Sequence, residues 1–338
     1  MKRIMSFVVA TIATLMVFSC EKAMNAPINE ETIAPSHQVL TKAAGDKTPS
    51  ILCYVETNDV NPLNALCCRM PDGEPFIDYV VLFASNIHST TVNNETQPTL
   101  YYNPQLTPIM DDPSTYIQPL QDDGQKVLLG VLGDWAGLGL ANMTITQAQQ
   151  FATILAYAVG EAGLDGVSFD DEYSGSNTVN NYSYSTIISY YRQLRPNDII
   201  HVFDWGGTYS ISSTAAATIN YAGHGYFYYN YFVPYTYSSI PGMTAARWSP
   251  ISLNLGATFS TSQLSTISSA AASAGNGGYG QIQLFNLRKC DDVCPKPVFQ
   301  AIADGLDWGT LYCNVVSEDK PTPVPGGEVI TYAMATAN

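Results

Sequence analysis

Charged side chains are scarce in this chain of 338 residues, of which only 13% are Asp, Glu, Lys or Arg. That is about half the usual share. The 14 Lys and Arg face 29 Asp and Glu, a formal net charge of −15, and no basic patch is present to bind the phosphates of a nucleic acid. Uncharged polar side chains and 22 Tyr must form much of the surface. This composition suits a neutral ligand that hydrogen-bonds and stacks, such as a sugar.

Apolar runs long enough to span a bilayer are absent beyond the first 20 residues. There, Lys2 and Arg3 precede an apolar run at residues 4–18, a pattern typical of a signal peptide. Cys20 directly follows Val-Phe-Ser, which resembles the lipobox of bacterial lipoproteins and implies a lipidated N-terminus after removal of residues 1–19. We therefore expect Sec-dependent export, a tether over residues 20–48, and lipid anchoring in the bacterial cell envelope, on the outer membrane, facing either the periplasm or the outside.

Cysteine and glycine patterns typical of metal or nucleotide sites are also missing. A Gly-x-Gly at residues 137–139 lacks the third Gly of a dinucleotide site, and no CxxC or Cys/His spacing suggests zinc. We expect neither a metal nor an organic cofactor. After export the cysteines that follow Cys20 can form disulfides, and 15 connectivities remain open. These cysteines are Cys53, Cys67, Cys68, Cys290, Cys294 and Cys313.

Eight short apolar runs recur between residues 49 and 315, a length typical of one α/β barrel. Helical patterns lie between them, and this alternation predicts a single (β/α)₈ TIM barrel. A doubly wound open sheet is the alternative, which periodicity does not exclude. Residues 316–338 begin with a Pro- and Gly-rich stretch that cannot continue a helix or sheet, so we expect a C-terminal tail. The runs begin at Ile51, Asp78, Lys126, Leu164, Asp198, Gly225, Trp248 and Gly278.

The clearest helical pattern follows the third run. Thr146 and Gln149 predict a capping box at its start, and Gly160 or Gly163 can end it. Apolar residues at helical spacing predict its buried face: Phe151, Ile154, Leu155, Ala158 and Val159.

An acidic cluster stands out in the stretch LDGVSFDDEYSG, residues 164–175. Side chains alternate along a strand, so Val167 and Phe169 would pack against helices while Asp170 and Glu172 face the barrel interior. These two acids then lie side by side at the C-terminal mouth, with Cα atoms roughly 7 Å apart. Barrel enzymes place their chemistry at this mouth.

Two acids on one strand cannot flank a bond from opposite sides, as the usual pair of glycosidase carboxylates does. They do suit substrate-assisted hydrolysis, in which a 2-acetamido group supplies the nucleophilic oxygen. One carboxylate orients that group and the other protonates the leaving oxygen, its pKa raised by its neighbour. Two other interpretations are a solvated loop start and a Ca²⁺ site, although the D-x-D-x-D-G order is absent.

The same residues carry a resemblance. Asp165, Asp170 and Glu172 fit three of the four positions in the D-x-x-D-x-D-x-E signature of glycoside hydrolase family 18. LDGVSFDDEY is similar to the endo-β-N-acetylglucosaminidase branch of Endo H type, which cuts between the two core N-acetylglucosamines of N-linked glycans. Further segments resemble that branch in order, from first strand to last: YVETND (54–59), FIDYVVLFASNIH (76–88), VLLGVLGDWAGLGLAN (127–142), WSPISLNLG (248–256) and GGYGQIQLFNL (277–287).

The resemblance implies residue roles. Glu172 would be the general acid/base, and Asp170 would hold the acetamido group. A Tyr after the sixth strand would bind the acetamido carbonyl, and Tyr231 is favoured over Tyr229 by its position. The residues expected to contact substrate are Asp165, Ser168, Glu56, Tyr229, Asn286 and Phe285.

Some positions depart from the family pattern. Ser168 stands where the signature has its second Asp, which lies behind the catalytic pair, so we expect altered pKa coupling rather than loss of the proton donor. Residues 203–207 and Asn254 also differ, which leaves the substrate preference open. Phe285 replaces a hydroxyl-bearing aromatic, so stacking would survive while a hydrogen bond is lost.

Two functions follow from the resemblance. The first is a retaining endoglycosidase acting on the di-N-acetylchitobiose core of N-linked glycans, with high-mannose glycans favoured. The second is a catalytically silent glycan-binding lipoprotein on the same barrel, and a chitinase acting on linear polymers is a third alternative. The expected partners are glycans or glycoproteins with an N-acetylglucosamine core and, through the lipid, a membrane. No coiled-coil heptads argue for assembly, so a monomer is expected.

Overall fold

The structure, a computed structural model, describes residues 47–134, 137–174, 178–205, 210–225, 238–314, 316 and 318–337. All of them belong to one compact unit of the chain, His37–Asn338. The predicted signal peptide, Cys20 and all but the end of the predicted tether lie outside the described residues. Within the described ranges, no helix is long and apolar enough to cross a membrane.

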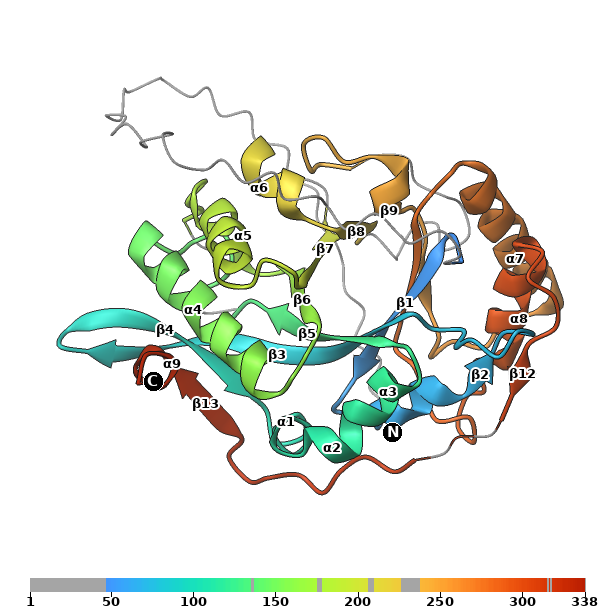
Figure 1. Cartoon of the computed structure of the whole chain (residues 1–338), viewed down its shortest axis with the longest axis horizontal. Helices are drawn as coiled ribbons and strands as arrows, with labels where there is room; N and C mark the ends of the chain where they lie inside the picture. Colours follow the sequence, from blue (N-terminus) through green and yellow to red (C-terminus); the bar gives the residue numbers. More distant parts are fainter. Residues whose placement is uncertain are drawn as a thin grey trace, which may run out of the picture. The chain divides into compact units, whose positions relative to one another are not determined.

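Nine parallel strands form a nearly closed barrel (Figure 1). The seventh position of the barrel is split, because β9 pairs with β8 while β10 pairs with β11. Strand β11 also pairs with β1, which brings the two ends of the barrel together. The predicted TIM barrel is confirmed and the open doubly wound sheet is excluded. The strands are β1 (Ser50–Glu56), β3 (Tyr79–Val92), β5 (Lys126–Leu132), β6 (Gly166–Asp170), β7 (Ile199–Asp204), β8 (Tyr221–His224), β9 (Trp248–Ser249), β10 (Ser252–Asn254) and β11 (Gln281–Phe285).

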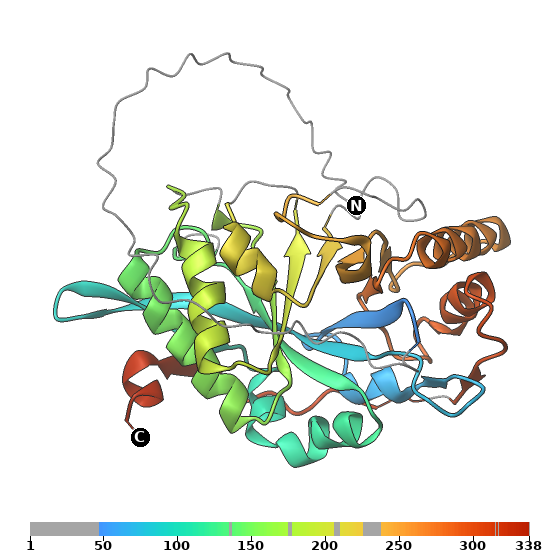
Figure 2. The same cartoon turned by 45° about the horizontal axis from the view of Figure 1, so that its top comes forward.

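Helices cover the outside of the barrel. Figures 1 and 2 show α4 beside α5, and α7 beside α8, as two pairs on different flanks. The helices are α1 (Thr107–Asp111), α2 (Pro113–Tyr116), α3 (Gln118–Asp122), α4 (Ile145–Glu161), α5 (Ser183–Leu194), α6 (Ser213–Thr218), α7 (Thr261–Asn276) and α8 (Lys296–Gly305), with 3₁₀ turns η1 (Pro62–Leu66) and η3 (Ala245–Arg247).

Two apolar clusters explain why the strands are apolar on both faces. The larger cluster lies between strands and helices and includes Val167 and Phe169 of β6. The smaller cluster fills the barrel interior with Leu52, Val81 and Leu128, topped by aromatic side chains. Strands β1, β3, β5 and β7 therefore bury alternate side chains in different clusters.

Helix α4 confirms the predicted buried face, since the five apolar residues named above are all buried. The predicted capping box is wrong by two residues: Thr144 caps the helix, and its partner is Gln147. The sequence offers two Thr-x-x-Gln patterns here, and the backbone of Thr144 is extended (ψ 164°), as an N-cap requires. Gly163 follows the helix with φ of +65°, a conformation that favours glycine.

The sixth strand also needs a correction. The apolar run from Gly225 was predicted to form it, whereas the strand is Tyr221–His224, four residues earlier. Its sequence, YAGH, contains no β-branched residue, so the pattern of apolar runs passed over it. Most of the predicted run, from residue 226 onward, lies outside the described residues.

Part of the predicted tail joins the sheet. Residues 318–327 have no helix or strand, but β13 (Glu328–Thr331) pairs antiparallel with β4 (Glu95–Tyr102), and α9 (Tyr332–Ala335) follows it. Antiparallel β4 forms a hairpin with β3, so the chain end extends the barrel sheet (Figure 1). The prediction of a tail over residues 316–338 is corrected for this last segment.

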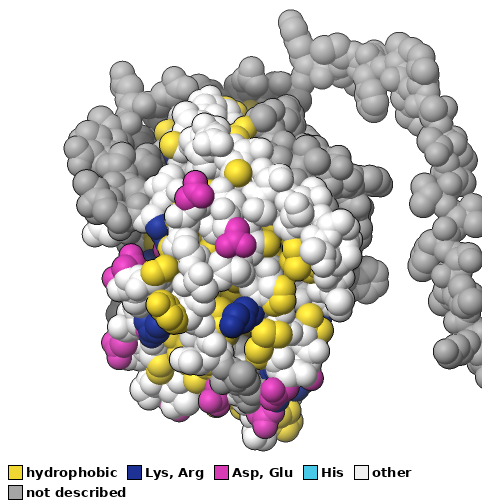
Figure 3. Space-filling model, turned by 90° about the vertical axis from the view of Figure 1, so that its right-hand side faces the viewer, with side chains coloured by type: hydrophobic (Ala, Val, Ile, Leu, Met, Phe, Trp, Pro, Cys, Tyr) yellow, Lys and Arg dark blue, Asp and Glu magenta, His cyan; other side chains and the backbone are white. Residues whose placement is uncertain are grey.

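The surface matches the composition on the face drawn in Figure 3. Uncharged polar side chains and backbone predominate there, and the acidic and basic side chains are scattered among them. No large patch of one charge sign is seen among the described side chains of this face.

Candidate active site

A cavity of about 500 Å³ opens at the C-terminal ends of the barrel strands. This is the face on which barrel enzymes carry their active sites. Five of the residues expected from the sequence meet here: Asp170, Glu172, Glu56, Phe285 and Asn286. The remaining lining residues are Tyr54, Asp59, Phe83, Phe203 and Asn254.

Strand β6 delivers the two central acids. Ser168 and Asp170 are buried on its inner face while Val167 and Phe169 join the outer cluster, so the predicted alternation is confirmed. Glu172 follows two residues after Asp170, just beyond the strand, and lines the same cavity. At the start of the strand, Gly166 has φ of +151° and its Cα lies against the backbone of β7, where a side chain would overlap.

Both acids have raised pKa values. Burial raises the pKa of Asp170 well above its usual range, and the charge of Glu172 raises it further. Burial also raises the pKa of Glu172. Two carboxyl groups this close do not both ionise readily, because the second charge would stand beside the first in a site shielded from water. One member can therefore donate a proton while the other accepts a hydrogen bond.

Trp205 orients Asp170, and sequence reasoning missed this contact. Its indole Nε1–H donates a hydrogen bond of 2.7 Å to Oδ1 of Asp170. Trp205 directly follows β7, and the register pairs Asp170 with Phe203 on that strand. The indole reaches across from the neighbouring strand, and its hydrogen bond lowers the pKa of Asp170 against the effect of burial.

Glu56 is a third acid with a raised pKa, at the end of β1. Burial, then the charge of Asp59, raises its pKa to about 7, while Arg288 acts in the opposite direction. Arg288 is paired with Asp59 at 2.6 Å. The charge of Glu172 also raises the pKa of Glu56, so the two acids interact across the cavity.

Ser168 belongs to a neutral network behind Asp170. Its hydroxyl lies 2.9 Å from the Tyr54 hydroxyl and 3.0 Å from Nδ1 of His201, and Tyr54 lies 3.2 Å from the same nitrogen. Burial lowers the pKa of His201 to about 3, so its ring is uncharged at neutral pH. Ser168 is fully buried and does not line the cavity. Its predicted contact with substrate is corrected to a contact with Tyr54 and His201.

Asp165 lies at the opposite end of β6 from the cavity. Its carboxylate accepts hydrogen bonds from the Val127 backbone N–H and from Gln121, and pairs with Lys126 at 2.9 Å. Asp165 and Asp170 are five positions apart, which corresponds to about 16 Å of strand. The predicted role of Asp165 in substrate binding is therefore wrong, and its contacts instead fasten β6 to β5 and α3.

Aromatic and amide side chains complete the cavity. Phe83, Phe203 and Phe285 supply apolar surface of the kind on which sugar rings stack. The Asn286 amide donates to Oδ1 of Asn254 at 2.9 Å, and Asn286 adopts a φ of +63° just after β11. These two amides hold each other in position at the rim, where their remaining donors and acceptors suit hydroxyl groups.

Comparisons with known proteins match this geometry. No protein-family model matches the chain. An endo-β-N-acetylglucosaminidase of Flavobacterium sp. (strain SK1022) is 33% identical over 253 residues, which cover 73% of this chain and 77% of that enzyme. The chain belongs to the endo-β-N-acetylglucosaminidases of glycoside hydrolase family 18.

Other relatives agree with this family. Endo-β-N-acetylglucosaminidase F1 of Elizabethkingia meningoseptica is 31% identical over 222 residues, covering 60% of this chain and 65% of that enzyme. EndoBT-3987 of Bacteroides thetaiotaomicron, solved with a Man5GlcNAc product, superposes with a TM-score of 0.65 at 28% identity, covering 81% of this chain and 64% of its own. The same enzyme, solved with a Man9GlcNAc2Asn substrate, gives 0.64 at 26% identity, with coverages of 81% and 70%. The chain thus spans just under two thirds of the F1 enzyme.

Within this endo-β-N-acetylglucosaminidase fold, one predicted element of the site is not placed. Tyr229 and Tyr231 lie outside the described residues. Trp205 and the Tyr54–Ser168–His201 network were missed because they depend on contacts between strands. The departure from the family pattern at residues 203–207 was the only sequence signal that pointed toward Trp205.

Proposed function

We propose that this chain is a retaining endo-β-N-acetylglucosaminidase that cleaves between the two core N-acetylglucosamines of N-linked glycans. The observation that carries the proposal is the placement of Asp170 and Glu172 together at the barrel mouth, in one cavity and with raised pKa values. Membership of the endo-β-N-acetylglucosaminidase family supports the same conclusion.

The first step follows from the positions of the two acids. The 2-acetamido carbonyl oxygen of the sugar attacks its own anomeric carbon, while Asp170 accepts a hydrogen bond from the acetamido N–H. Trp205 keeps the Asp170 carboxylate turned for this contact. Glu172 gives its proton to the leaving glycosidic oxygen, a role that its raised pKa favours.

In the second step, Glu172 acts as the base. It takes a proton from a water molecule that attacks the anomeric carbon of the oxazolinium intermediate, and the acetamido group is regenerated. Two displacements at one carbon retain its configuration. No carboxylate on the opposite side of the sugar is needed, which fits two acids that stand two residues apart at the end of β6.

We further propose high-mannose N-glycans, and glycoproteins that carry them, as substrates. EndoBT-3987 was solved with Man9GlcNAc2Asn, and the similarity covers 81% of the present chain and 70% of EndoBT-3987. The aromatic and amide lining of the cavity carries hydrogen-bonding groups and apolar surface for a neutral sugar. Asn254 and Asn286 are the described rim residues that would contact sugar hydroxyls.

The decisive experiment is intact-mass measurement of a glycoprotein with one high-mannose glycan after incubation with the purified protein. The carrier should keep a single N-acetylglucosamine and lose the rest. Glu172→Gln keeps the shape of the side chain but removes the proton donor, so the rate should fall by about 10²–10⁴-fold while glycan binding is retained. Glu161→Gln, at an exposed position in α4, is the control and should leave the rate unchanged.

Other outcomes would point to the alternatives. A wild-type protein that binds the glycoprotein without changing its mass would be a glycan-binding protein that has lost turnover. Cleavage of linear N-acetylglucosamine polymers, with the glycoprotein left intact, would indicate a chitinase. Either result contradicts the proposed activity.

We also propose that the protein acts as a monomer anchored to the cell envelope through lipid on Cys20. The signal-like residues 1–19 and the lipobox-like Val-Phe-Ser-Cys support this location. Cys20→Ala should move the protein from the membrane fraction to the soluble fraction of expressing cells. A protein that stays in the membrane fraction after this change would contradict the anchor, and size-exclusion chromatography of the soluble form tests the monomer.

A further inference from the structure

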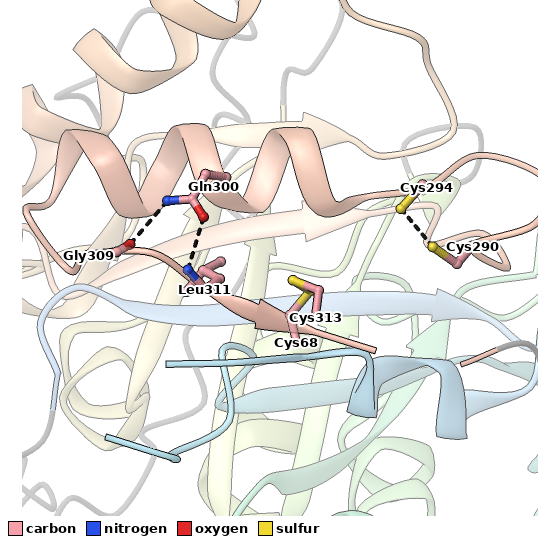
Figure 4. The surroundings of a disulfide bond; sticks show 7 residues. All are labelled: Cys68, Cys290, Cys294, Gln300, Gly309, Leu311 and Cys313. Carbon is pink, nitrogen blue, oxygen red and sulfur yellow. Dashed lines mark hydrogen bonds between the residues drawn. A yellow bond between two sulfur atoms is a disulfide. The ribbon is translucent and has the colours of Figure 1, made fainter. Parts of the chain in front are cut away.

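Five cysteines line a cavity of about 130 Å³, and Figure 4 shows four of them, Cys68, Cys290, Cys294 and Cys313. One disulfide, Cys68–Cys313, joins the short strands β2 (Cys68–Arg69) and β12 (Tyr312–Cys313). The other three, Cys67, Cys290 and Cys294, are thiols. No group of three or more His, Cys, Asp or Glu is arranged to hold a metal ion in the part of the chain that the structure describes. The thiols are therefore candidates for covalent chemistry rather than for metal binding.

Cys290 and Cys294 face each other directly. Their Sγ atoms lie 2.6 Å apart, nearer to the length of a disulfide, about 2.05 Å, than to an ordinary thiol contact. The backbone creates this approach: the N–H groups of Asp292 and Val293 both donate to the Lys289 carbonyl, at 3.0 and 3.1 Å. A tight turn thus folds the chain back on itself between the two cysteines.

The end of this turn is fixed by α8. Cys294 stands just ahead of the helix, and Gln300 on α8 bonds to both the Gly309 carbonyl and the Leu311 N–H, at 3.1 and 2.9 Å (Figure 4). Those two residues lead into β12. The helix is thereby held against the strand that carries the existing disulfide, so Cys294 stays opposite Cys290 without help from a covalent bond.

Accessibility separates this pair from the other thiols. Cys294 is exposed and Cys290 is half-buried, whereas Cys53 and Cys67 are 0% and 4% exposed. Burial raises the pKa of Cys290 to about 11, which disfavours its thiolate. Because Cys294 is the more exposed of the two, we expect it to react first with an oxidant. The reaction needs an accessible first thiol and a second thiol within reach, and Cys290–Cys294 meets both conditions.

We propose that Cys290 and Cys294 close into a second disulfide, which fastens the segment between β11 and α8. In the reaction, Cys294 attacks the disulfide of a small oxidant such as oxidised glutathione, which releases one glutathione thiol. Cys290 then attacks the mixed disulfide and releases the second. Two protein thiols become one disulfide, and the oxidant is reduced to two thiols.

The disulfide would act on the rim of the active-site cavity. The segment between β11 and α8 begins at Asn286, which lines the cavity, and the disulfide would close its far end. The same segment carries Arg288, paired with Asp59 on the opposite rim at 2.6 Å, and Lys289, paired with Asp319 at 2.5 Å. Fixing the end of the segment reduces its freedom before substrate binds. This consequence for turnover rests on the proposed function, whereas formation of the bond does not.

The chemical test uses the full chain. The protein is incubated with oxidised glutathione, alkylated with iodoacetamide under denaturing conditions without reductant, and digested with trypsin and chymotrypsin. The peptide Cys290–Phe299 should carry no alkyl group and be two hydrogens lighter than its dithiol. Two alkyl groups on this peptide, or a cross-link from it to the peptide containing Cys67, would overturn the proposal. Cys67→Ser is the control and should leave the closed peptide unchanged.

A second measurement reads the effect on the fold. The double variant Cys290→Ser, Cys294→Ser, compared with oxidised wild type, should lower the thermal midpoint by about 2–4 °C, since Cys68–Cys313 is intact in both. Its KM for the glycoprotein should rise while kcat is retained. An unchanged midpoint and KM, with the closed peptide present, would overturn the role in fastening the rim. Absence of activity in both proteins would contradict the proposed function and leave the mass result standing.

Discussion

Trp205 gives the Asp170 carboxylate a fixed direction. An acid whose pKa is raised by burial tends to be protonated, and its carboxyl group can then turn toward any available hydrogen-bond partner. The indole N–H, 2.7 Å from Oδ1, favours the ionised form and leaves Oδ2 for the acetamido N–H of a substrate. Trp205 thus offsets part of the effect of burial on the pKa of Asp170, while burial still raises the pKa of Glu172, the proton donor.

Trp205→Phe should impair catalysis more than binding. The change keeps an aromatic ring but removes the donor, so the pKa of Asp170 rises further and less carboxylate is available at acidic pH. We expect kcat to fall about tenfold, the effect of losing one charge-assisted hydrogen bond. The acidic limb of the kcat/KM profile should shift to higher pH.

The matched control for this prediction is Trp308→Phe. Trp308 packs edge-on against Phe76, outside the active-site cavity. Its substitution can lower stability but has no path to the titration of Asp170. A Trp205→Phe enzyme whose pH profile coincides with that of wild type would show that the indole does not orient the acid.

Ser168 replaces the second Asp of the family signature and still makes hydrogen bonds to its neighbours. A carboxylate at this position would add a negative charge behind Asp170, roughly 7 Å away along the strand. Ser168 instead joins Tyr54 and His201 in hydrogen bonds of 2.9–3.2 Å, all within an uncharged network. The altered pKa coupling expected from the sequence remains a prediction, and this network is its physical basis.

At the scale of elements, sequence patterns predicted those features that repeat. Seven of the eight strands and the buried face of α4 follow from apolar runs and helical spacing. The alternation of Ser168 and Asp170 against Val167 and Phe169 also follows from strand geometry alone. Strand β8 was misplaced because its four residues carry no such pattern, and its burial comes from neighbouring strands.

The candidate site was predictable only along β6. Glu172 follows two residues after Asp170, the last residue of β6, so their proximity follows from the period of an extended chain. The partners of that strand depend on register, such as Ser168 opposite His201 on β7, and a single sequence does not specify register between distant segments. Asp165 was misassigned for a related reason: it shares a motif with the acids but lies at the far end of the strand.

The cap of α4 offers a direct test of an element boundary. Thr144 accepts from the Gln147 N–H, and the Gln147 side chain in turn accepts from the Thr144 N–H. Thr144→Ala should therefore lower the free energy of unfolding by about 1 kcal/mol, measured by urea denaturation. Thr146→Ala, two residues later and also exposed, should have almost no effect. Equal losses from the two variants would contradict the boundary observed in the structure.

At the scale of the whole molecule, buried acids and buried histidines oppose each other in the dependence of stability on pH. The pKa of Glu56 is raised to about 7 and that of Asp171 to about 6, each chiefly by burial. Burial lowers the pKa of His201 to about 3 and that of His224 to about 4. The acids stabilise the fold while protonated, whereas the histidines stabilise it while neutral, so the two effects run in opposite directions below about pH 6.5.

Glu56→Gln isolates one side of this balance. Glu56 has a higher pKa in the folded chain than when unfolded, so its favourable contribution is complete below about pH 4.5 and is lost as pH rises through about 7. The variant cannot ionise and should therefore exceed wild type in free energy of unfolding by about 1–3 kcal/mol at pH 8, with most of this difference lost by pH 5. Thermal or urea unfolding at both pH values measures it, with Glu95→Gln, an exposed position on β4, as the control. A difference that is the same at pH 5 and pH 8 would mean that Glu56 has the same pKa in the folded chain as in the unfolded one. Burial in the cavity would then not raise the pKa of this acid.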